Sequence, residues 1–557
     1  MRLFSDRQKL HSFLLIGTIV LLGAFLYLPS IGNQFVSWDD EMLIYGNPWL
    51  RALNISTITH IFTHFDPELY DPLTLFAWQA IVAVAGFQPV AFHLASLLLF
   101  LGSTVLVFVI TERLTKNRTT AVIVTLLWAL HPLNAAAVLW ASAFKDVLSS
   151  FFFLSSLLTY LYFRGSGARS TYVFSILLFL PGLLSKVSVV FLPLILILID
   201  LLQKRRLTRG AIVEKIPYVL LSILFLIIAF FGKGQTIASL TAAETMALSL
   251  RAILFSALHI VWPWPLAIIY PVTTPVHLVS LPTALSGLAG VAFLLIAILL
   301  RRRVPWLSFG LLWFLILLVP SFATFLKGTG VTLTSDQYLM LPMIGILLPL
   351  AVALTRLAQR RRAIAIVCML IVLLPLSLVT ASRGRVWRDS ISLYRDTIAH
   401  FPDVIAMHYN LGLAYSHVRD FPMALSEFDR VLALDPAHAA AHTDKGYVFQ
   451  LQGKKEDAMK EFRTAIALDA RSSEAHNNIG TLFFDAYQYD KAIAEFEAAV
   501  AINPRYVQAW NNLAAAYGKV GKHREGLMAM RSAFLLDPSK TAQVKQIDET
   551  LAAQQQK

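Results

Sequence analysis

Long apolar segments, repeated along the N-terminal two thirds of the chain, constrain its fold more than any other feature of the sequence. Segments of roughly 17–25 apolar residues are long enough to cross a lipid bilayer as helices. The first is HSFLLIGTIVLLGAFLYLP, residues 11–29, which we expect to be retained as an anchor because no small-x-small cleavage site follows it. With 57% hydrophobic and 15% charged residues, the chain is too apolar for an ordinary soluble core. The sequence therefore predicts a polytopic membrane helical bundle.

The basic residues predict an orientation for this bundle. They cluster in short segments between the apolar ones, which is the pattern of the positive-inside rule. The segments placed inside hold 20 Lys and Arg residues, and the segments placed outside hold 6. This asymmetry predicts a cytoplasmic N-terminus and, after eleven crossings, an outward-facing C-terminal region. The expected spans are 11–29, 91–111, 119–131, 147–163, 171–185, 187–202, 216–231, 283–300, 304–326, 337–354 and 363–380.

Two of the outside segments, 30–90 and 232–282, are long. The first carries the acidic stretch Trp38-Asp39-Asp40-Glu41 and a short apolar piece, LTLFAWQAIVAVAG, that is expected not to span. The second contains LSLRAILFSALHIVWPWP, which is expected to lie along the membrane interface with Trp262 and Trp264 at its boundary.

A repeat of 34 residues dominates the C-terminal part. Asp435-Pro436, Asp469-Ala470, Asn503-Pro504 and Asp537-Pro538 share this offset, as do a small-residue position, an alanine position and an aromatic position. These three positions are Gly412, Gly446, Gly480 and Ala514; Ala424, Ala458, Ala492 and Gly526; and Phe428, Phe462, Phe496 and Met530. Small residues let two helices approach, the aromatic ring fills the gap, and proline ends the second helix. The pattern resembles tetratricopeptide (TPR) repeats.

Stacked TPR helices form a solenoid whose concave face binds extended peptides. One row in register comprises Asn410, Asp444, Asn478 and Asn512, and amides of this kind can bind a peptide backbone without reading its side chains. We predict an acceptor-peptide groove along this row, with ordinary solvated polar faces as the alternative. A second row comprises His408, His442, His476 and Trp510; this position packs between helices in such repeats, so metal binding is not expected there.

Four polar clusters lie on the predicted outer side of the membrane part, where polarity is costly. They contain Trp38-Asp39-Asp40-Glu41; His131, Lys145 and Asp146; Lys186; and Lys327, Asp336 and Tyr338. Lysines at headgroup level can bind the phosphate of a lipid as point charges, and a partly desolvated carboxylate can act as a general base for a hydroxyl acceptor. The alternative for each lysine is a snorkelling headgroup contact, and for the acidic stretch a solvated loop.

The order of these motifs is similar to that of the transmembrane-and-TPR protein O-mannosyltransferases and their bacterial relatives, within the C-type superfamily of polyprenyl-phosphate-sugar glycosyltransferases. The matching motifs are F-x-x-WDD with a following GNP, FHLASLLL at 92–99, HPL at 131–133, KDVLS at 145–149, LLSK at 183–186, WPWPLAIIYP at 262–271, DQYLMLP at 336–342, and the repeats. The resemblance implies an inverting transfer of a sugar from a polyprenyl phosphate to Ser or Thr of a protein.

The resemblance also implies roles for single residues. The catalytic carboxylate is expected at Asp39, with Asp40 as its rival and Glu41 as an auxiliary group. The donor and lipid-phosphate site is expected to comprise Lys145, Lys186, Lys327, His131, Asp146, Asp336, Tyr338 and His93. Three departures from the family pattern, namely Asn134-Ala135-Ala136 after HPL, Gln337 within DQY and Val187 after LLSK, leave the identity of the sugar open.

Two other classes of function compete with an enzyme. One is a non-catalytic membrane scaffold whose TPRs recruit partners for envelope or polysaccharide assembly. The other is a transporter or lipid flippase, but midplane charges and inverted repeats, which favour transport, are not seen in the sequence. Nucleic-acid binding is not expected, because no basic patch interleaved with aromatics lies outside the membrane loops. No metal site is predicted, although the acidic stretch leaves a divalent cation open.

The predicted architecture is therefore all-α, with a membrane bundle followed by a TPR α-solenoid. The expected parts are a membrane domain over 1–382, a connector helix over 383–402, four TPR repeats over 403–540, and a C-terminal cap and tail over 541–557. The single cysteine, Cys368, allows no disulfide within the chain. We expect an integral protein of a bacterial inner membrane, with the N-terminus cytoplasmic and the TPR domain periplasmic.

Overall fold

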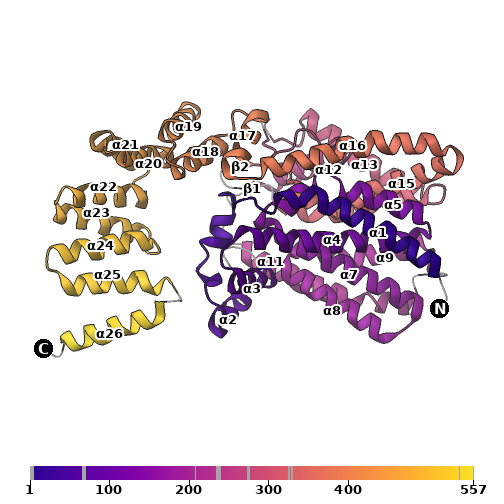
Figure 1. The fold of residues 1–557 in the computed structure, drawn as a ribbon, viewed down its shortest axis with the longest axis horizontal. Helices are drawn as coiled ribbons and strands as arrows, with labels where there is room; N and C mark the ends of the chain where they lie inside the picture. The colour runs from indigo at the N-terminus through magenta and orange to yellow at the C-terminus, as the bar shows by residue number, and fades with distance from the viewer. Residues whose placement is uncertain are drawn as a thin grey trace. The chain divides into compact units, whose positions relative to one another are not determined.

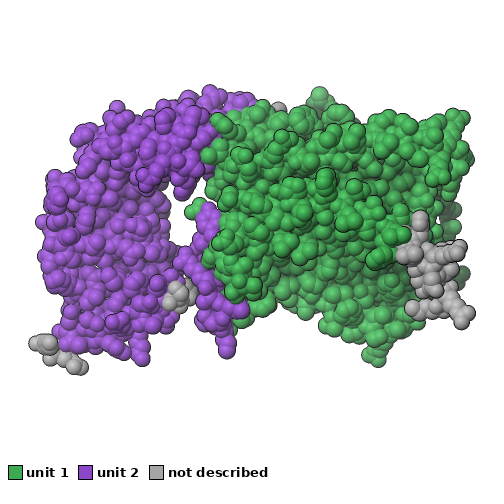
Figure 2. All heavy atoms as spheres, in the orientation of Figure 1, with its two compact units in different colours: residues 1–44, 58–400 green, residues 45–57, 401–557 purple. Residues whose placement is uncertain are grey.

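The computed structural model describes residues 6–65, 70–206, 208–233, 240–272, 276–323, 326–327, 330–537 and 540–555. The chain divides into two compact units, which Figure 2 shows in different colours. Unit 1 contains residues 1–44 and 58–400, and unit 2 contains residues 45–57 and 401–557. Nearly all of the regular structure is helical (Figure 1), which confirms the predicted all-α class.

Unit 1 is a bundle of apolar helices in which neighbours along the chain pack together, as α7 does with α8 and α14 with α15. Its longer helices are α1 (Asp6–Tyr27), α3 (Pro72–Ala85), α4 (Pro89–Thr115), α5 (Arg118–Ala129), α7 (Phe144–Ser166), α8 (Arg169–Ser185), α9 (Leu192–Leu202), α11 (Ile216–Lys233), α12 (Ala242–Val261), α13 (Leu281–Leu299), α14 (Pro305–Leu318), α15 (Pro342–Arg360), α16 (Arg362–Val386) and α17 (Ser390–His400). Three shorter ones are α2 (Ile55–Thr63), α6 (Asn134–Leu139) and α10 (Arg209–Val213). β1 (Leu326–Lys327) pairs antiparallel with β2 (Gly330–Val331).

The number of helices able to cross a membrane differs from the sequence prediction. Among the described residues, nine helices are long and apolar enough, and four apolar helices are shorter. Three predicted spans, 119–131, 171–185 and 187–202, fall on shorter helices. The predicted start of another span at 337 is also wrong, because residues 336–339 form a 3-10 turn and α15 begins at Pro342.

The buried segment after α5 explains why that helix is short. α5 has 12 residues, which gives a length of about 18 Å, less than the roughly 30 Å hydrocarbon core. The chain then turns at His131-Pro132 and continues through α6, and every residue from 129 to 144 is buried. Irregular backbone is tolerated at membrane depth where protein surrounds it. α5 can therefore end early, because the backbone that follows it is surrounded by protein and not by lipid.

α12 is long enough to cross a membrane, although its sequence predicts an interfacial helix. It packs against α13, where Leu250 and Ile253 lie close to Gly287 and Gly290, and it also contacts residues of loops. Leu248 and Ala252 pack against Val272, Phe322 and Leu333, and the Arg251 guanidinium donates to the hydroxyls of Ser280 and Thr283. α12 thus packs against the next helix as well as against segments that join other helices, and its interfacial position stays a prediction.

α14 and α15 approach each other closely through two glycines. A Cβ atom added to Gly310 would lie 2.1 Å from the carbonyl oxygen of Gly345, and one added to Gly345 would lie 2.4 Å from the carbonyl oxygen of Gly310. Small residues let the backbones of membrane helices approach in this way. The two helices lead into the loop that carries Asp336 and Tyr338, so this crossing helps to position the residues of the candidate site.

Replacing Gly310 by Ala is expected to lower the thermal stability of the protein in detergent. The added methyl group must push α14 away from α15, and such overpacking costs about 1–3 kcal/mol. Gly17→Ala is the matched control, because nothing lies within 4 Å of its added Cβ, so the control should melt at or above the wild-type temperature. Equal melting temperatures for Gly310→Ala and wild type would contradict the contact.

The end of the last apolar helix lies beside the loop that follows the first. The side-chain amide of Asn33 donates to the Gly384 carbonyl at 3.0 Å, and the backbone N–H of Gln34 donates to the Arg388 carbonyl at 2.9 Å. The N–H of Ser37 donates to the Ser390 hydroxyl at 2.9 Å. The acidic stretch and the segment through which the chain leaves unit 1 are therefore at the same end of that unit.

Unit 2 consists mainly of helix pairs, shown in the yellow and orange part of Figure 1. They are α18 (Ile405–His417) with α19 (Phe421–Leu434), α20 (Ala439–Leu451) with α21 (Lys455–Leu468), α22 (Ser473–Asp485) with α23 (Tyr489–Ile502), and α24 (Val507–Lys519) with α25 (His523–Leu535). α26 (Thr541–Gln555) follows. A Cβ on Gly412, Gly446 or Gly480 would lie 2.6–2.7 Å from the ring of the paired phenylalanine, which explains the repeated Gly and Phe positions.

The histidine row bridges the two helices of each of three repeats. The Nδ1 atoms of His408, His442 and His476 lie 2.6, 2.6 and 2.7 Å from the carboxylates of Glu427, Glu461 and Glu495, respectively. The bond to Glu427 raises the pKa of His408. In the fourth repeat Trp510 and Ala529 occupy these two positions, and the indole N–H of Trp510 donates to the Pro504 carbonyl at 2.9 Å. The row therefore has a structural role within the repeats.

Candidate active site

The acidic stretch leads into a π-helix, Glu41–Tyr45, a rare turn that is frequent at functional sites. Asp40 is buried, with 1% of its surface exposed. Its Oδ2 accepts from the N–H of Val36 at 2.9 Å, and its Oδ1 accepts from the N–H of Ser142 at 2.9 Å and from the Ser142 hydroxyl. Burial raises the pKa of Asp40 to about 7, although these hydrogen bonds act to lower it.

Asp39 differs from its neighbour in exposure and in bonding. Its side chain is half-buried, and no side-chain hydrogen bond or ion pair joins it to the part of the chain that the structure describes. Glu41 is exposed. Both oxygens of Asp40 are already engaged by donors, whereas the Asp39 carboxylate has its lone pairs available for a proton. The geometry therefore favours Asp39 as a base and Asp40 as a group that holds the loop in place.

Ser142 was not foreseen from the sequence, and it links the acidic stretch to the lysine cluster. It lies in the 3-10 turn Ala141–Ala143, which runs directly into α7 and its residues Lys145 and Asp146. Four residues of helix rise about 6 Å. The segment 141–146 thus contacts the acidic stretch at one end and carries the predicted phosphate-binding residues at the other.

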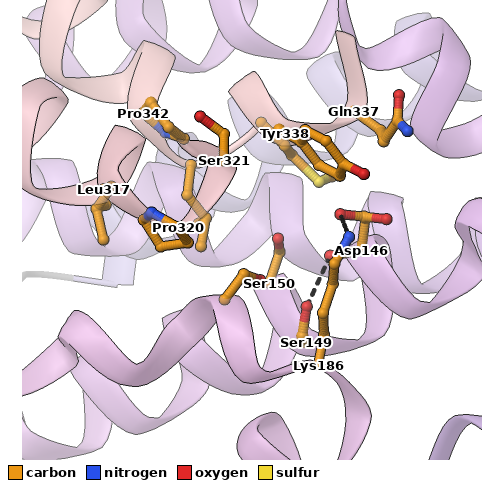
Figure 3. Close-up of a pocket in the computed structure, with 13 residues that line it drawn as sticks. Asp146, Ser149, Ser150, Lys186, Leu317, Pro320, Ser321, Gln337, Tyr338 and Pro342 are labelled. Carbon is orange, nitrogen blue, oxygen red and sulfur yellow. Dashed lines mark hydrogen bonds and ion pairs between the residues drawn. The ribbon is translucent and has the colours of Figure 1, made fainter. Parts of the chain in front are cut away.

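Lys186 and Asp146 form an ion pair at the wall of a small pocket (Figure 3). The pocket has a volume of about 50 Å³, and Ser149, Ser150 and Tyr338 also line it. The Lys186 ammonium lies 4.5 Å from the centre of the Tyr338 ring. Figure 3 shows the Lys186 and Asp146 side chains meeting close to the Tyr338 ring. Hydroxyl groups, an ammonium group and a carboxylate are the polar groups that a phosphate and a sugar require.

A second carboxylate, Asp71, joins this cluster from the loop before α3. Its Oδ2 lies 4.0 Å from the Lys145 ammonium. Burial raises the pKa of Asp71, and the charges of Lys145 and Lys186 oppose that rise. No local pattern in the sequence points to Asp71, because its contact with Lys145 joins residues that lie far apart in the chain. The two lysines and two carboxylates balance in charge, so an incoming phosphate would compete with the carboxylates for the ammonium groups.

His131 and Asp336 take part in a buried network next to the pocket. The Tyr270 hydroxyl donates to Asp336 Oδ1 at 2.7 Å and lies 2.8 Å from His259 Nε2. His131 Nε2 lies 2.9 Å from the Ile260 carbonyl. These bonds hold the Asp336–Tyr338 turn against the end of α12. Donor binding by His131 and Asp336 stays a prediction.

Two further residues of the predicted donor-sugar site, His93 and Lys327, are not among the described residues that line this pocket. His93 is buried near the start of α4, beside the backbone of Asn33 and Gln34, so it contacts the base of the acidic loop. Lys327 is in β1, and its side chain lies outside the described part of the structure.

The predicted peptide-binding row lies on the first helices of the repeats, α18, α20, α22 and α24, and its members are half-buried. Asp444 accepts a hydrogen bond from the Tyr409 hydroxyl at 2.5 Å, and burial raises its pKa to about 6. Asn512 donates to Asn477 at 2.8 Å, and Asn478 accepts from Asn477 at 3.4 Å. Three of the four side chains, those of Asp444, Asn478 and Asn512, thus bond to neighbouring side chains of these first helices. Within the described ranges no group of three or more His, Cys, Asp or Glu side chains is placed to hold a metal.

Comparison with known proteins supports both parts of the predicted resemblance. Family models described as "TPR repeat" and "Tetratricopeptide repeat" match residues 480–521 and 417–475. The chain is 29% identical over 144 residues to the protein O-mannosyl-transferase TMTC1 of Homo sapiens, covering 24% of this chain and 16% of the relative. It is 30% identical over 151 residues to the protein O-mannosyl-transferase tmtc2 of Xenopus laevis, covering 25% and 18%.

These matches are partial. The chain spans less than a fifth of the length of these curated relatives. Among solved structures, a crystal structure of MamA is similar with 22% identity and a TM-score of 0.24, covering 28% of this chain and 90% of that one. The sequence similarity thus confirms the resemblance to the transmembrane-and-TPR protein O-mannosyltransferases.

Proposed function

We propose that this chain is a membrane glycosyltransferase that moves a sugar from a polyprenyl phosphate to Ser or Thr of an acceptor protein. The observation that carries the proposal is the segment Ala141–Asp146. It bonds to Asp40 through Ser142 and carries Lys145 and Asp146, whose partners are Asp71 and Lys186. The loop that carries Asp39 is therefore bonded to the same short segment that carries Lys145 and the partner of Lys186. The named activity of the relatives supports the same class of reaction.

The proposed reaction uses Asp39 of the acidic stretch and the two lysines Lys145 and Lys186. Asp39 takes the proton from the acceptor hydroxyl, and the oxygen attacks the anomeric carbon of the sugar. The new bond joins the acceptor oxygen to that carbon, while the bond from the carbon to the phosphate oxygen breaks. The electron pair leaves with the lipid phosphate, and attack from the opposite side inverts the anomeric centre. Lys186 and Lys145 stabilise the charge that develops on the phosphate.

The TPR unit is proposed to present the acceptor protein. Asn410, Asp444, Asn478 and Asn512 would bind its backbone along the first helices of the repeats. The bundle's acidic loop bonds to residues 384–390, directly before the chain enters the repeats. We propose that the acidic stretch and the repeats share the outer, periplasmic face of a bacterial inner membrane, with the N-terminus in the cytoplasm.

Mass spectrometry of envelope proteins from a deletion strain tests the proposal. The strain is expected to lack a hexose-type adduct on Ser or Thr, and expression of the wild-type chain should restore it. An unchanged set of adducts in the deletion strain would reject protein O-glycosylation.

Ser142→Ala is expected to move the acidic limb of the pH–rate profile to higher pH. Ionised Asp40 accepts three hydrogen bonds, from the N–H groups of Val36 and Ser142 and from the Ser142 hydroxyl, so transfer should require its charged form. The Ser142 hydroxyl stabilises that form, and losing a bond to a charged group raises the pKa, so the limb should move by about one pH unit. Ser103→Ala, which removes another buried hydroxyl that bonds to the Leu99 carbonyl and not to Asp40, is the control. A profile that is only scaled down, without moving, would mean that Ser142 is structural alone.

A further inference from the structure

A groove on the second TPR repeat has none of the proposed catalytic, donor-binding or acceptor-binding residues among the described residues that line it. It runs along α21 and is closed on its other side by the end of α22, with a volume of about 740 Å³. Leu482 is buried, and Met459 and Phe483 are half-buried, so these side chains form an apolar floor. Lys455, Lys460 and Arg463, also lining the groove, are exposed.

The three cations are not neutralised by their surroundings. No ion pair joins Lys455, Lys460 or Arg463 to any residue within the described ranges. Glu456 is the single acidic residue among those that line the groove. The groove thus has an apolar floor bordered by positive charges that have no ion-pair partner within the described ranges.

This charge is not required by the repeat itself. The first repeat has Phe421, Ser426 and Asp429 at the corresponding positions, and the third has Tyr489, Ala494 and Glu497. Both repeats form the same pair of helices as the second. The fourth repeat has His523, Met528 and Arg531, and Arg531 is paired with Asp548. A set of three Lys and Arg residues without ion pairs within the described ranges is therefore particular to the second repeat, and packing of the solenoid does not explain it.

We infer that this groove docks an amphipathic protein segment that carries carboxylates beside apolar side chains. Residues 455, 459 and 463 follow the four-residue spacing of one helix face, against which a partner helix lays its own apolar face. The rim charges then select acidic over basic or neutral segments. The apolar floor is half-buried between two helices. The side chains of a narrow protein segment can reach it, whereas a flat bilayer surface cannot, so a protein segment is favoured over a membrane.

The docking site is separate from the proposed acceptor groove. The asparagine row lies on the first helix of each repeat, whereas this groove is built mainly on α21, a second helix. The inference does not rest on the proposed enzymatic activity, and a glycosyl-transfer assay on the same variants tells the two apart.

Fluorescence anisotropy with the full chain in detergent tests the inference. The probe is a labelled peptide of about four helical turns, with Leu and Phe on one face and Glu beside them; its twin has Gln for Glu. The variant is Lys460→Glu with Arg463→Glu. The control is Lys519→Glu with Arg524→Glu, which makes the same change in charge at two exposed residues of the fourth repeat.

The Glu probe is expected to bind the wild type and the control with equal affinity, and the groove variant at least about tenfold more weakly. Its affinity for the wild type should fall as the salt concentration rises. The Gln twin should bind weakly to all three. Equal binding of the Glu probe to all proteins, or no binding to the wild type, would overturn the inference. So would a groove variant that keeps the peptide but loses vesicles containing phosphatidylglycerol, which would identify the groove as a lipid-binding surface.

Discussion

Replacing Asp39 by Asn is expected to lower glycosyl transfer by about 10²–10⁴-fold, the contribution of a general base. Asn has the same shape as Asp but cannot take the proton of the acceptor hydroxyl. The Asp39 carboxylate makes no side-chain bond with the described residues, so the folded protein should be unaffected. Transfer from a polyprenyl-phosphate sugar to an acceptor peptide in proteoliposomes measures the rate, and thermal melting measures the fold.

Glu41→Gln is the matched control for this substitution, because Glu41 belongs to the same stretch and is exposed. It should reduce transfer far less than Asp39→Asn. A protein that transfers sugar normally with Asn at 39 would exclude Asp39 as the base. A protein whose cellular role is also unaffected would favour the scaffold interpretation.

Replacing Lys186 by Met is expected to lower transfer by about 10²–10³-fold, as loss of one charge-stabilising donor does in other enzymes. The ammonium group stands at the wall of the pocket, over the Tyr338 ring. Without it, the charge that develops on the leaving phosphate is less well stabilised. The same substitution leaves Asp146 buried without its partner, which costs stability by itself.

A second variant separates these two effects. Lys186→Met combined with Asp146→Asn removes the unpaired charge, so thermal stability should return towards that of the wild type. Transfer should remain low, because the cation is still absent. Recovery of transfer in the double variant would show that Lys186 serves only to neutralise Asp146.

The repeats could be predicted in detail because their pattern is local and periodic. Gly446 and Phe462 recur with their equivalents every 34 residues, and the structure shows that the ring occupies the space a Cβ would need. The histidine row was visible in the same way. Its glutamate partners share an equally constant spacing of 19 residues, which was not recognised in the sequence.

The membrane part could be predicted less well. Hydropathy shows that a segment is apolar, but it does not show whether that segment is buried inside the protein or exposed to lipid. α5 and the buried turn after it are equally apolar in sequence, so the end of the helix was not visible. The contacts of the candidate site are long-range: Asp40 with Ser142, and Asp71 with Lys145. No periodicity connects such residues. The sequence identified Lys186 and Asp146 as candidates, and the structure shows that they form an ion pair with each other.

The proposed function requires above all that the acidic stretch and the TPR repeats face the same side of the membrane. Labelling of intact spheroplasts with a membrane-impermeant maleimide tests this directly, using Glu41→Cys, Lys454→Cys and Arg302→Cys, each made with Cys368→Ser, which removes the single native cysteine. Cysteines at 41 and 454 are expected to be labelled in intact spheroplasts, and the cysteine at 302, in a predicted inner loop, only after permeabilisation. Labelling at 41 with protection at 454, or the reverse, would contradict the account.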